Sequence, residues 1–388
     1  MKVTGIDTVI VGNPWKNWIL VRLETDLGID GIGEGTLEHR TLATDQAIRE
    51  LADYVIGRDP ANVERLVFQM KQETYTPGIL VHTIISAFEM ACWDIMGKFQ
   101  GVPVHRFFGG KFQERIPVYA NGWYRVERDP KQFQAAAEAA LDHGFLALKF
   151  DPFGSAQGGL THREMQLAIN IVRAVKDVAE SRGASIIVEG HARFDAGTAK
   201  RIARELEPFD PLWFEEPVYY TDVRGHAAVR QSTTVPIASG EHSVMLHEYV
   251  EFLQQDAVDI LQPDIAHVGG LLQAKKIAAL AEGFGKYCTF HSPLSPVVTA
   301  ASLQLNATCP NAHIQECFDH FNPEWTHEIF GNPPTIEDGA VAISDAPGLG
   351  ITVDWENARK YPYASRNRQF MFRAGWEKRQ GQIHTEEG

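Results

Sequence analysis

The 388-residue chain is poor in cysteine and in positive charge, and both shortages exclude whole classes of protein. Its four cysteines form no Cys-x-x-Cys pair, and each lies in or beside an apolar run. Such cysteines are typical of buried free thiols in a reducing compartment, not of a disulfide framework. Lysine and arginine number 36 against 50 aspartates and glutamates, a formal net charge of −14. This balance argues against nucleic acid or an anionic membrane as a partner.

Long apolar runs are missing as well. No stretch approaches the roughly 18 residues of a membrane span. The first residues carry Asp7 where a secretory signal would need its apolar core. We therefore expect a cytoplasmic protein. The length suits a barrel of about 250 residues with a second domain, and 44% apolar with 22% charged residues is ordinary for a soluble enzyme.

What the chain does contain is a run of three glutamates at an interval of 26 residues. Glu189, Glu215 and Glu241 each end a short apolar, strand-like run, and each run is followed by room for one helix and two loops. This is the rhythm of a parallel barrel, whose strands end at one rim. Three carboxylates gathered there repel one another unless a cation lies between them, and oxygen ligands suit a hard ion such as Mg²⁺. The pattern predicts a metal site and, by its position, a catalytic one.

The first third of the chain follows a different pattern from the rest. Apolar runs at 3–11 and 18–25 with glycine-rich turns predict antiparallel strands, and the apolar stripe over 82–99 predicts a helix. We expect this domain to end near 113–116. Residues 318–388, rich in proline, glycine and aromatics, are expected to return and pack on it.

Between these parts, strands and helices alternate. The clearest helices are predicted at 130–143 and 161–182. The predicted strands are 117–121, 146–151, 185–191, 212–216, 236–241, 259–264, 287–291 and 313–317. Eight parallel strands with intervening helices predict an α/β barrel with an irregular final unit.

Two histidines are candidates for acid–base chemistry. His291 and Asp264 end adjacent predicted strands, and a carboxylate bonded to one imidazole nitrogen raises the basicity of the other. We interpret the pair as a general base, with a structural histidine as the alternative. His191 lies two residues beyond Glu189, so both side chains point to the same side of an extended chain. There it can donate a proton to a leaving group, ligate the metal or simply fill space. By the same alternation, Glu216 is expected to face away from the site.

Further candidates line the same predicted rim. Lys149 and Asp151 share one face of the second strand, and both are candidates for substrate contact. The alternatives for the lysine are a base or a residue satisfied by neighbouring acids. Glu316 on the last strand is a candidate to hydrogen-bond the substrate or an enolate if protonated. Weaker candidates for substrate contact are Asn121, Trp15 and His242. Trp15 has domain packing as its alternative, and His242 a solvated or structural role.

Several motifs together resemble one family. They are Ser-Ala-Phe-Glu-Met-Ala-Cys-Trp-Asp-Ile-Met-Gly-Lys at 86–98, followed by Gly-Val-Pro-Val and Phe-Gly-Gly, and then Phe-Glu-Glu-Pro, Ser-Gly-Glu and Gln-Pro-Asp-Ile-x-x-x-Gly-Gly. Over nearly its whole length the chain resembles the enolase superfamily. Within it, the chain looks like the mandelate-racemase-like branch and, in that branch, the galactonate- and gluconate-type acid-sugar dehydratases.

The resemblance implies a modified TIM barrel, (β/α)₇β, under an N-terminal α+β capping domain that the C-terminal segment completes. We place the capping domain at 1–115, the barrel at 116–325 and the returning segment at 326–388. The family is commonly oligomeric, often octameric, which implies a homo-oligomer.

The resemblance also implies roles for the residues named above. Positions Glu189, Glu215 and Glu241 match the ligands of one Mg²⁺ per subunit. His291 with Asp264 matches the dyad that removes the proton α to the substrate carboxylate. His191 matches the acid for the departing 3-hydroxyl, and Glu316 a glutamate near the enolate. The implied reaction is dehydration of a sugar acid, through an enediolate, to a 2-keto-3-deoxy acid.

The chain departs from the family pattern in two places. Glu189 stands where galactonate dehydratases more often carry aspartate, and Lys149-Phe-Asp151 breaks the Lys-x-Lys of mandelate racemase. Loss of the second lysine removes the base on the opposite face and disfavours racemisation. A cycloisomerase or epimerase on the same scaffold stays the alternative, since it shares the enolate step. A zinc hydrolase barrel is disfavoured because the first strand lacks paired histidines.

Overall fold

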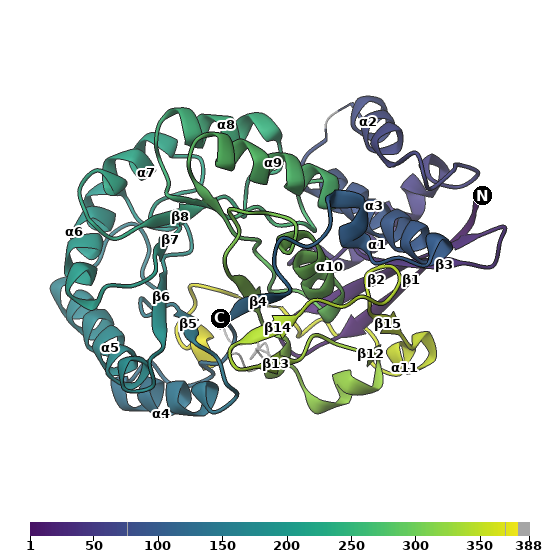
Figure 1. Ribbon diagram of the computed structural model, residues 1–388. Coiled ribbons are helices and arrows are strands. Elements are labelled where there is room, and N and C mark those ends of the chain that lie inside the picture. Colours follow the sequence, from purple (N-terminus) through teal and green to yellow (C-terminus); the bar gives the residue numbers. More distant parts are fainter. Residues whose placement is uncertain (76, 369, 379–388) are drawn as a thin grey trace, which may run out of the picture.

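The computed structural model describes residues 1–75, 77–368 and 370–378. Figure 1 shows an N-terminal sheet with its helices on one side of the molecule and a ring of strands wrapped by helices on the other. The N-terminal elements are β1 (Val3–Gly12), β2 (Asn17–Thr25), β3 (Asp30–Glu34), α1 (Thr41–Glu50), η1 (Leu51–Tyr54), α2 (Val63–Glu73), α3 (Ile79–Gln100) and η2 (Val104–Phe108). The three strands form an antiparallel sheet in chain order; β1 and β2 were predicted, and β3 follows the turn after β2.

Helix α3 packs directly against the sheet because glycines in β3 let it approach. A Cβ atom on Gly31 would lie 2.1 Å from the backbone oxygen of Ala91, and one on Gly33 would lie 2.0 Å from that of Ala87. Among the described residues, α3 is the one helix long and apolar enough to cross a membrane, but 72% of its apolar window is buried inside the protein. Its apolar length therefore serves the core of this domain.

The second domain alternates strand and helix from residue 115 to residue 317. Its strands are β4 (Arg115–Ala120), β5 (Ala147–Phe150), β6 (Ser185–Glu189), β7 (Phe214–Glu215), β8 (Ile237–Ser239), β9 (Ile260–Leu261), β10 (Tyr287–Cys288) and β11 (Gln315–Cys317). Its helices are α4 (Pro130–Leu141), α5 (His162–Ser181), α6 (Ala196–Leu206), η3 (Glu207–Phe209), α7 (Val223–Arg230), α8 (Leu246–Gln254), α9 (Leu271–Gly283) and α10 (Pro296–Asn306). One α-helix follows each of the first seven strands, which is the predicted (β/α)₇β order.

The strands lie in chain order and pair in parallel from β4 to β10, and β11 pairs with the other side of β4. Between β10 and β11 the described residues show no ladder. The gap is bridged where Cys288 N–H donates to Asn311 O at 3.0 Å and Gln315 Nε2 to Phe290 O at 2.7 Å. The interior is filled by one buried residue from, or beside, each of six consecutive strands: Tyr119, Ala147, Ile187, Trp213, Ala238 and Ile260. The domain is therefore barrel-like, with a packed interior.

Each predicted strand is present, and all except β4 are shorter than predicted. β9, for example, spans two residues where six were predicted. The helices begin where local caps dictate: the Asp129 side chain accepts from two backbone N–H groups of α4, and Thr161 with Glu164 forms a capping box on α5. After β6 and β7 the chain leaves the extended conformation at His191 and Glu216, which belong to the rim.

The C-terminal segment contacts both domains. It contains η4 (Asp319–Phe321), η5 (Glu324–Glu328), β12 (Phe330–Gly331), β13 (Ile336–Glu337), β14 (Ala340–Ala342), β15 (Thr352–Val353), α11 (Trp355–Arg359) and η6 (Trp376–Lys378). β14 pairs antiparallel with barrel strand β4. Gly12 N–H donates to Tyr361 O at 2.7 Å, which joins the segment to the N-terminal sheet. Residues 370–378 then pass back to the barrel, where Trp376 Nε1 donates to Gly154 O. The sequence predicted only the return to the capping domain.

Candidate active site

A cavity of about 540 Å³ opens where the N-terminal domain covers the rim of the barrel. The N-terminal domain contributes Trp15, Lys16, Leu37, Glu38, His39, Arg40 and Ile79. The barrel contributes Asn121, Lys149, Glu189, His191, Glu241, His242, His267 and His291, among others. Neither domain alone encloses this space, so the site belongs to their junction.

The three evenly spaced glutamates converge at the rim. Glu189 and Glu215 end β6 and β7, and Glu241 lies two residues beyond β8. One oxygen from each lies within 4.8 Å of the others. Burial, and then repulsion from Glu215, raises the pKa of Glu189 well above its ordinary value. Burial, and then Glu216, raises the pKa of Glu241 to about 7. The arrangement holds more negative charge than the protein itself neutralises, and this favours a bound cation.

Lys149 lies at the base of this group. Its Nζ is 2.6 Å from Glu215 Oε1, 2.8 Å from Glu316 Oε1 and 3.5 Å from Glu189 Oε2. Burial opposes its charge, but Glu215 and Glu316 outweigh burial and raise the pKa of Lys149 well above its ordinary value. A lysine held in this protonated form is unsuited to act as a base. Of the three interpretations of Lys149, the geometry favours a cation satisfied by neighbouring acids at the edge of the cavity.

The predicted contact between Asp264 and His291 is present. Asp264 and His291 are joined by an isolated parallel bridge next to β9 and β10, and Asp264 Oδ2 lies 2.8 Å from His291 Nδ1. The other ring nitrogen, Nε2, lies 3.4 Å from Glu241 Oε2. Burial lowers the pKa of His291, but Glu241 and Glu316 outweigh it and raise that pKa to about 10. The imidazole is therefore fixed by Asp264, with its free nitrogen beside the carboxylate group.

His191 lines the cavity at the β6 side, but not because the chain stays extended. Its φ is 50°, and that of Ala192 is 51°, so the chain turns left-handed directly after β6. His191 N–H donates to Glu189 Oε1 at 2.7 Å, and its Nδ1 lies 2.6 Å from Asp151 Oδ2. Burial lowers the pKa of His191, partly offset by Asp151. His191 therefore lies beside Glu189 as predicted, but a left-handed turn and not strand alternation places it there.

Asp151, predicted to contact substrate, lies elsewhere. It is fully buried and is not among the residues that line the cavity. Its carboxylate contacts His191, accepts from Arg193, and accepts from Phe153 N–H at 2.8 Å. These contacts occupy both oxygens, so Asp151 orients His191 from behind instead of facing a substrate.

Glu316 lies on β11, and Asn121 directly follows β4, the strand with which β11 pairs. Asn121 Nδ2 donates to Glu316 Oε1 at 2.8 Å, and Ser292 N–H donates to Glu316 Oε2 at 2.6 Å. Burial opposes ionisation of Glu316, but Lys149 and His291 lower its pKa below the ordinary value. Asn121 lines the cavity, as does Trp15, whose ring stacks on Phe318 at 5.7 Å. The geometry therefore favours an ionised Glu316 over the protonated one that its predicted role needs.

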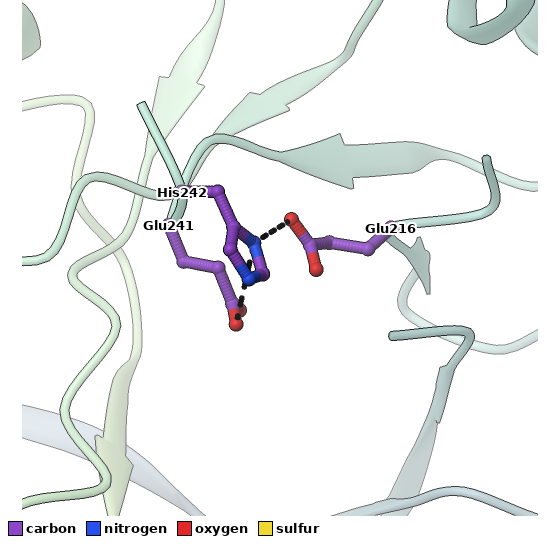
Figure 2. A group of neighbouring side chains, drawn as sticks. All are labelled: Glu216, Glu241 and His242. Carbon is purple, nitrogen blue, oxygen red and sulfur yellow. Dashed lines mark hydrogen bonds and ion pairs between the residues drawn. The ribbon is translucent and has the colours of Figure 1, made fainter. Parts of the chain in front are cut away.

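Glu216 does not face away from the site, contrary to the alternation argument. Its φ is 41°, so the chain leaves the strand conformation there. Figure 2 shows its carboxylate directed at His242, and Glu216 Oε1 lies 2.9 Å from His242 Nδ1. Glu216, Glu241 and His242 form a second group able to hold a metal ion, which shares Glu241 with the first. An imidazole ligand suits a softer ion than Mg²⁺, so the all-carboxylate group is the better magnesium site.

Several cavity residues gave no signal in the sequence pattern. Arg193 pairs with Asp151 and lines the cavity beside His191. Met371 and Phe372 reach the cavity from the far end of the chain. These residues meet only through long-range packing, which periodicity and spacing do not encode.

A barrel-like α/β domain with three rim carboxylates, an aspartate–histidine pair beside them and a covering N-terminal domain defines an enzyme of the enolase type. The chain belongs to the mandelate racemase and muconate lactonizing enzyme family of that superfamily. Residues 132–358 match the model of the enolase C-terminal domain-like family. Residues 7–109 match the model of the mandelate racemase/muconate lactonizing enzyme N-terminal domain.

Characterised relatives align with most of the chain. It is 34% identical over 350 residues to the D-gluconate dehydratase of Thermoproteus tenax, covering 89% of this chain and 70% of that one. It is 33% identical over 375 residues to the D-galactonate dehydratase of Variovorax paradoxus, covering 95% of each. The crystal structure of a mandelate racemase/muconate lactonizing enzyme from Jannaschia is similar, with a TM-score of 0.87, 31% identity, and coverage of 94% of this chain and 98% of that one.

Proposed function

We propose that the protein is a Mg²⁺-dependent dehydratase that converts a sugar acid of the gluconate or galactonate kind to a 2-keto-3-deoxy acid. Its main support is the placement of two histidines in one cavity. His191 follows β6 and His291 follows β10, so they lie on the two sides of the three glutamates. Dehydration needs one group to take a proton from C2 and another to give a proton to the hydroxyl at C3. The cavity offers one imidazole for each task.

Glu189, Glu215 and Glu241 would hold the Mg²⁺. Their donor atoms are all carboxylate oxygens, lie within 4.8 Å of one another and carry uncompensated charge. When bound, the ion would stabilise the negative charge that develops on the substrate carboxylate as the C2 proton leaves. Neutralising Glu241 also removes the largest influence that keeps His291 protonated, so that His291 becomes free to accept a proton.

His291 and His191 then perform the proton transfers. Nε2 of His291, held toward the cavity by the bond from Nδ1 to Asp264, takes the proton from C2 of the substrate. His191, held through Nδ1 by Asp151, gives a proton to the C3 hydroxyl, which leaves as water. The C–O bond breaks as the C2–C3 double bond forms, and the resulting enol tautomerises to the 2-keto-3-deoxy acid.

The substrate class follows from the relatives and from the site. Relatives named D-gluconate and D-galactonate dehydratase suggest an aldonate. Asn121, Trp15 and His242 line the cavity and would contact the polyol chain. We further propose that the enzyme acts in the cytoplasm as a homo-oligomer on small molecules alone.

The test is a screen of the purified protein with Mg²⁺ against mono- and diacid sugars, with semicarbazide absorbance for the 2-keto-3-deoxy product and NMR for exchange of the C2 proton in D₂O. The expected result is one or a few aldonates that lose water. His291→Asn should abolish both exchange and dehydration, whereas His191→Asn should lower dehydration by about 10²–10⁴-fold and keep exchange. Exchange without dehydration in the wild type, for every acid, would replace the dehydratase with an epimerase or cycloisomerase.

A further inference from the structure

The last described stretch, residues 370–378, forms part of the cavity wall. Met371 and Phe372 line the cavity. The match to the family model ends at residue 358, before this wall. The Phe372 φ of 73° is unusual for an aromatic residue, and such backbone strain concentrates at functional sites.

Trp376 is the residue of this stretch that contacts the proposed acid. Its ring meets the His191 ring edge-on, with centroids 5.7 Å apart and planes at 85°. Its Nε1–H donates to Gly154 O at 3.0 Å, and only 3% of the residue is exposed. The indole is therefore fixed by its own hydrogen bond and packs against one side of His191.

A second route leads from the same stretch to His191. The Arg193 guanidinium lies 4.9 Å from the Phe372 ring centroid, and its Nη1 donates to Gly154 O at 2.6 Å. Arg193 also pairs with Asp151, the carboxylate that holds His191. Gly154 O thus accepts from both Trp376 and Arg193. The two routes join the C-terminal stretch to the same imidazole, once directly and once through Arg193 and Asp151.

We propose that Trp376 is a positioning residue for His191, and that residues 370–378 complete the acid side of the active site. This inference rests on the proposed function, because it assigns the supported imidazole the task of protonating the leaving hydroxyl. His291 is held by Asp264 on the other side of the carboxylate group and has no part in this wall. Trp376 therefore acts on the dehydration step and not on removal of the C2 proton.

The experiment compares Trp376→Ala and Trp376→Phe with the wild type in holoenzyme containing Mg²⁺. Trp376→Ala should lower kcat for dehydration by roughly 10–100-fold, since small displacements of a catalytic group have effects of this size. C2-proton exchange should stay within about twofold of the wild type. Trp376→Phe keeps the ring against His191 and should recover much of the loss. Trp325→Ala is the matched control: that indole stacks on Tyr361, at 3.9 Å, outside the cavity lining, and should leave both rates unchanged.

A chemical probe tests the contact without relying on activity. Diethyl pyrocarbonate modifies exposed imidazoles, and peptide mapping reports each histidine separately. Trp376→Ala should speed modification of His191 several-fold and leave His291 unchanged. Equal loss of exchange and dehydration, or unchanged rates for both together with unchanged His191 modification, would overturn the positioning role. If no sugar acid is dehydrated but His191 modification still rises, the contact stands and the dehydratase assignment fails.

Discussion

The ammonium of Lys149 lies 2.6 Å from the carboxylate of Glu215, which is one of the three proposed magnesium ligands. The other oxygen of Glu215 accepts from Trp213 Nε1 at 2.7 Å and from Gln262 Nε2 at 2.9 Å. Burial opposes ionisation of Glu215, but Lys149 more than offsets it and lowers the pKa to about 2. The protein thus holds one protonated lysine among these carboxylates, and the proposed Mg²⁺ would supply the rest of the neutralisation.

Replacing Lys149 with methionine should destabilise the metal-free protein by roughly 3–5 kcal/mol, because it leaves buried carboxylates without their partner. Added Mg²⁺ should recover more stability in Lys149→Met than in the wild type, since the ion then replaces part of the missing charge. Urea unfolding with EDTA and with Mg²⁺ measures both effects. Lys131→Met, on the exposed face of α4, serves as the control. Equal stability of Lys149→Met and wild type without metal would contradict the prediction.

Cation binding should release protons. Burial and Glu216 raise the pKa of Glu241 to about 7, so near pH 6 the metal-free carboxyl is mostly protonated and must lose its proton to bind an ion. The affinity for Mg²⁺ should therefore fall as the pH drops below about 7. Near pH 8 the ion should still release protons, now from His291. The negative charge of Glu241 raises the pKa of His291, and a bound ion neutralises that charge. Titration calorimetry in two buffers of different ionisation enthalpy counts the protons, expected to be at least one per ion because the pKa of Glu189 is raised as well. Binding without proton release at either pH would place the ion elsewhere.

The two possible metal sites that share Glu241 predict different effects of substitutions on metal binding. With the ion on the all-carboxylate group, Glu189→Gln should weaken Mg²⁺ binding by roughly 100-fold and Glu216→Gln by less than about tenfold. Mn²⁺ binding followed by electron paramagnetic resonance gives both affinities, and Glu241→Gln should be weak in either case because Glu241 belongs to both groups. The reverse ranking of Glu189→Gln and Glu216→Gln would assign the ion to Glu216, Glu241 and His242.

The domains are joined by a buried carboxylate that caps a helix. Glu89 of α3 accepts from the backbone N–H groups of Leu271 and Leu272 at the start of α9, at 2.8 and 2.9 Å. Glu89→Ala should lower the free energy of unfolding by roughly 2–4 kcal/mol, because those buried N–H groups lose their acceptor. Glu64→Ala is a matched control. It removes an exposed ion pair with Lys276 that also joins the two domains, between α2 and α9, and it should cost less than about 1 kcal/mol. Similar losses in both variants, measured by urea unfolding, would argue against the capping role.

The sequence predicted the order of elements well because hydrophobic periodicity reports which segments are buried. The eight strands and the convergence of Glu189, Glu215 and Glu241 follow from that periodicity and from barrel geometry. Side-chain directions just past the strands did not follow. His191 and Glu216 lie in left-handed conformations, and alternation holds only for extended chain.

Sequence patterns did not predict that the C-terminal segment contributes to the site. Trp376 has no periodic context, and its partner Gly154 is more than two hundred residues earlier in the chain. Its place is decided by tertiary contacts, among them the hydrogen bond to Gly154 and the ring contact with His191. The position of the imidazole could be predicted, but what supports it could not.

The residues that line the cavity range in sequence from Trp15 to Phe372. During synthesis on the ribosome, the carboxylates and both histidines emerge well before Met371 and Phe372 do. A nascent or prematurely terminated chain therefore contains the reactive groups without a closed site around them. The cavity is complete only once Met371 and Phe372 have been made and have packed against the barrel.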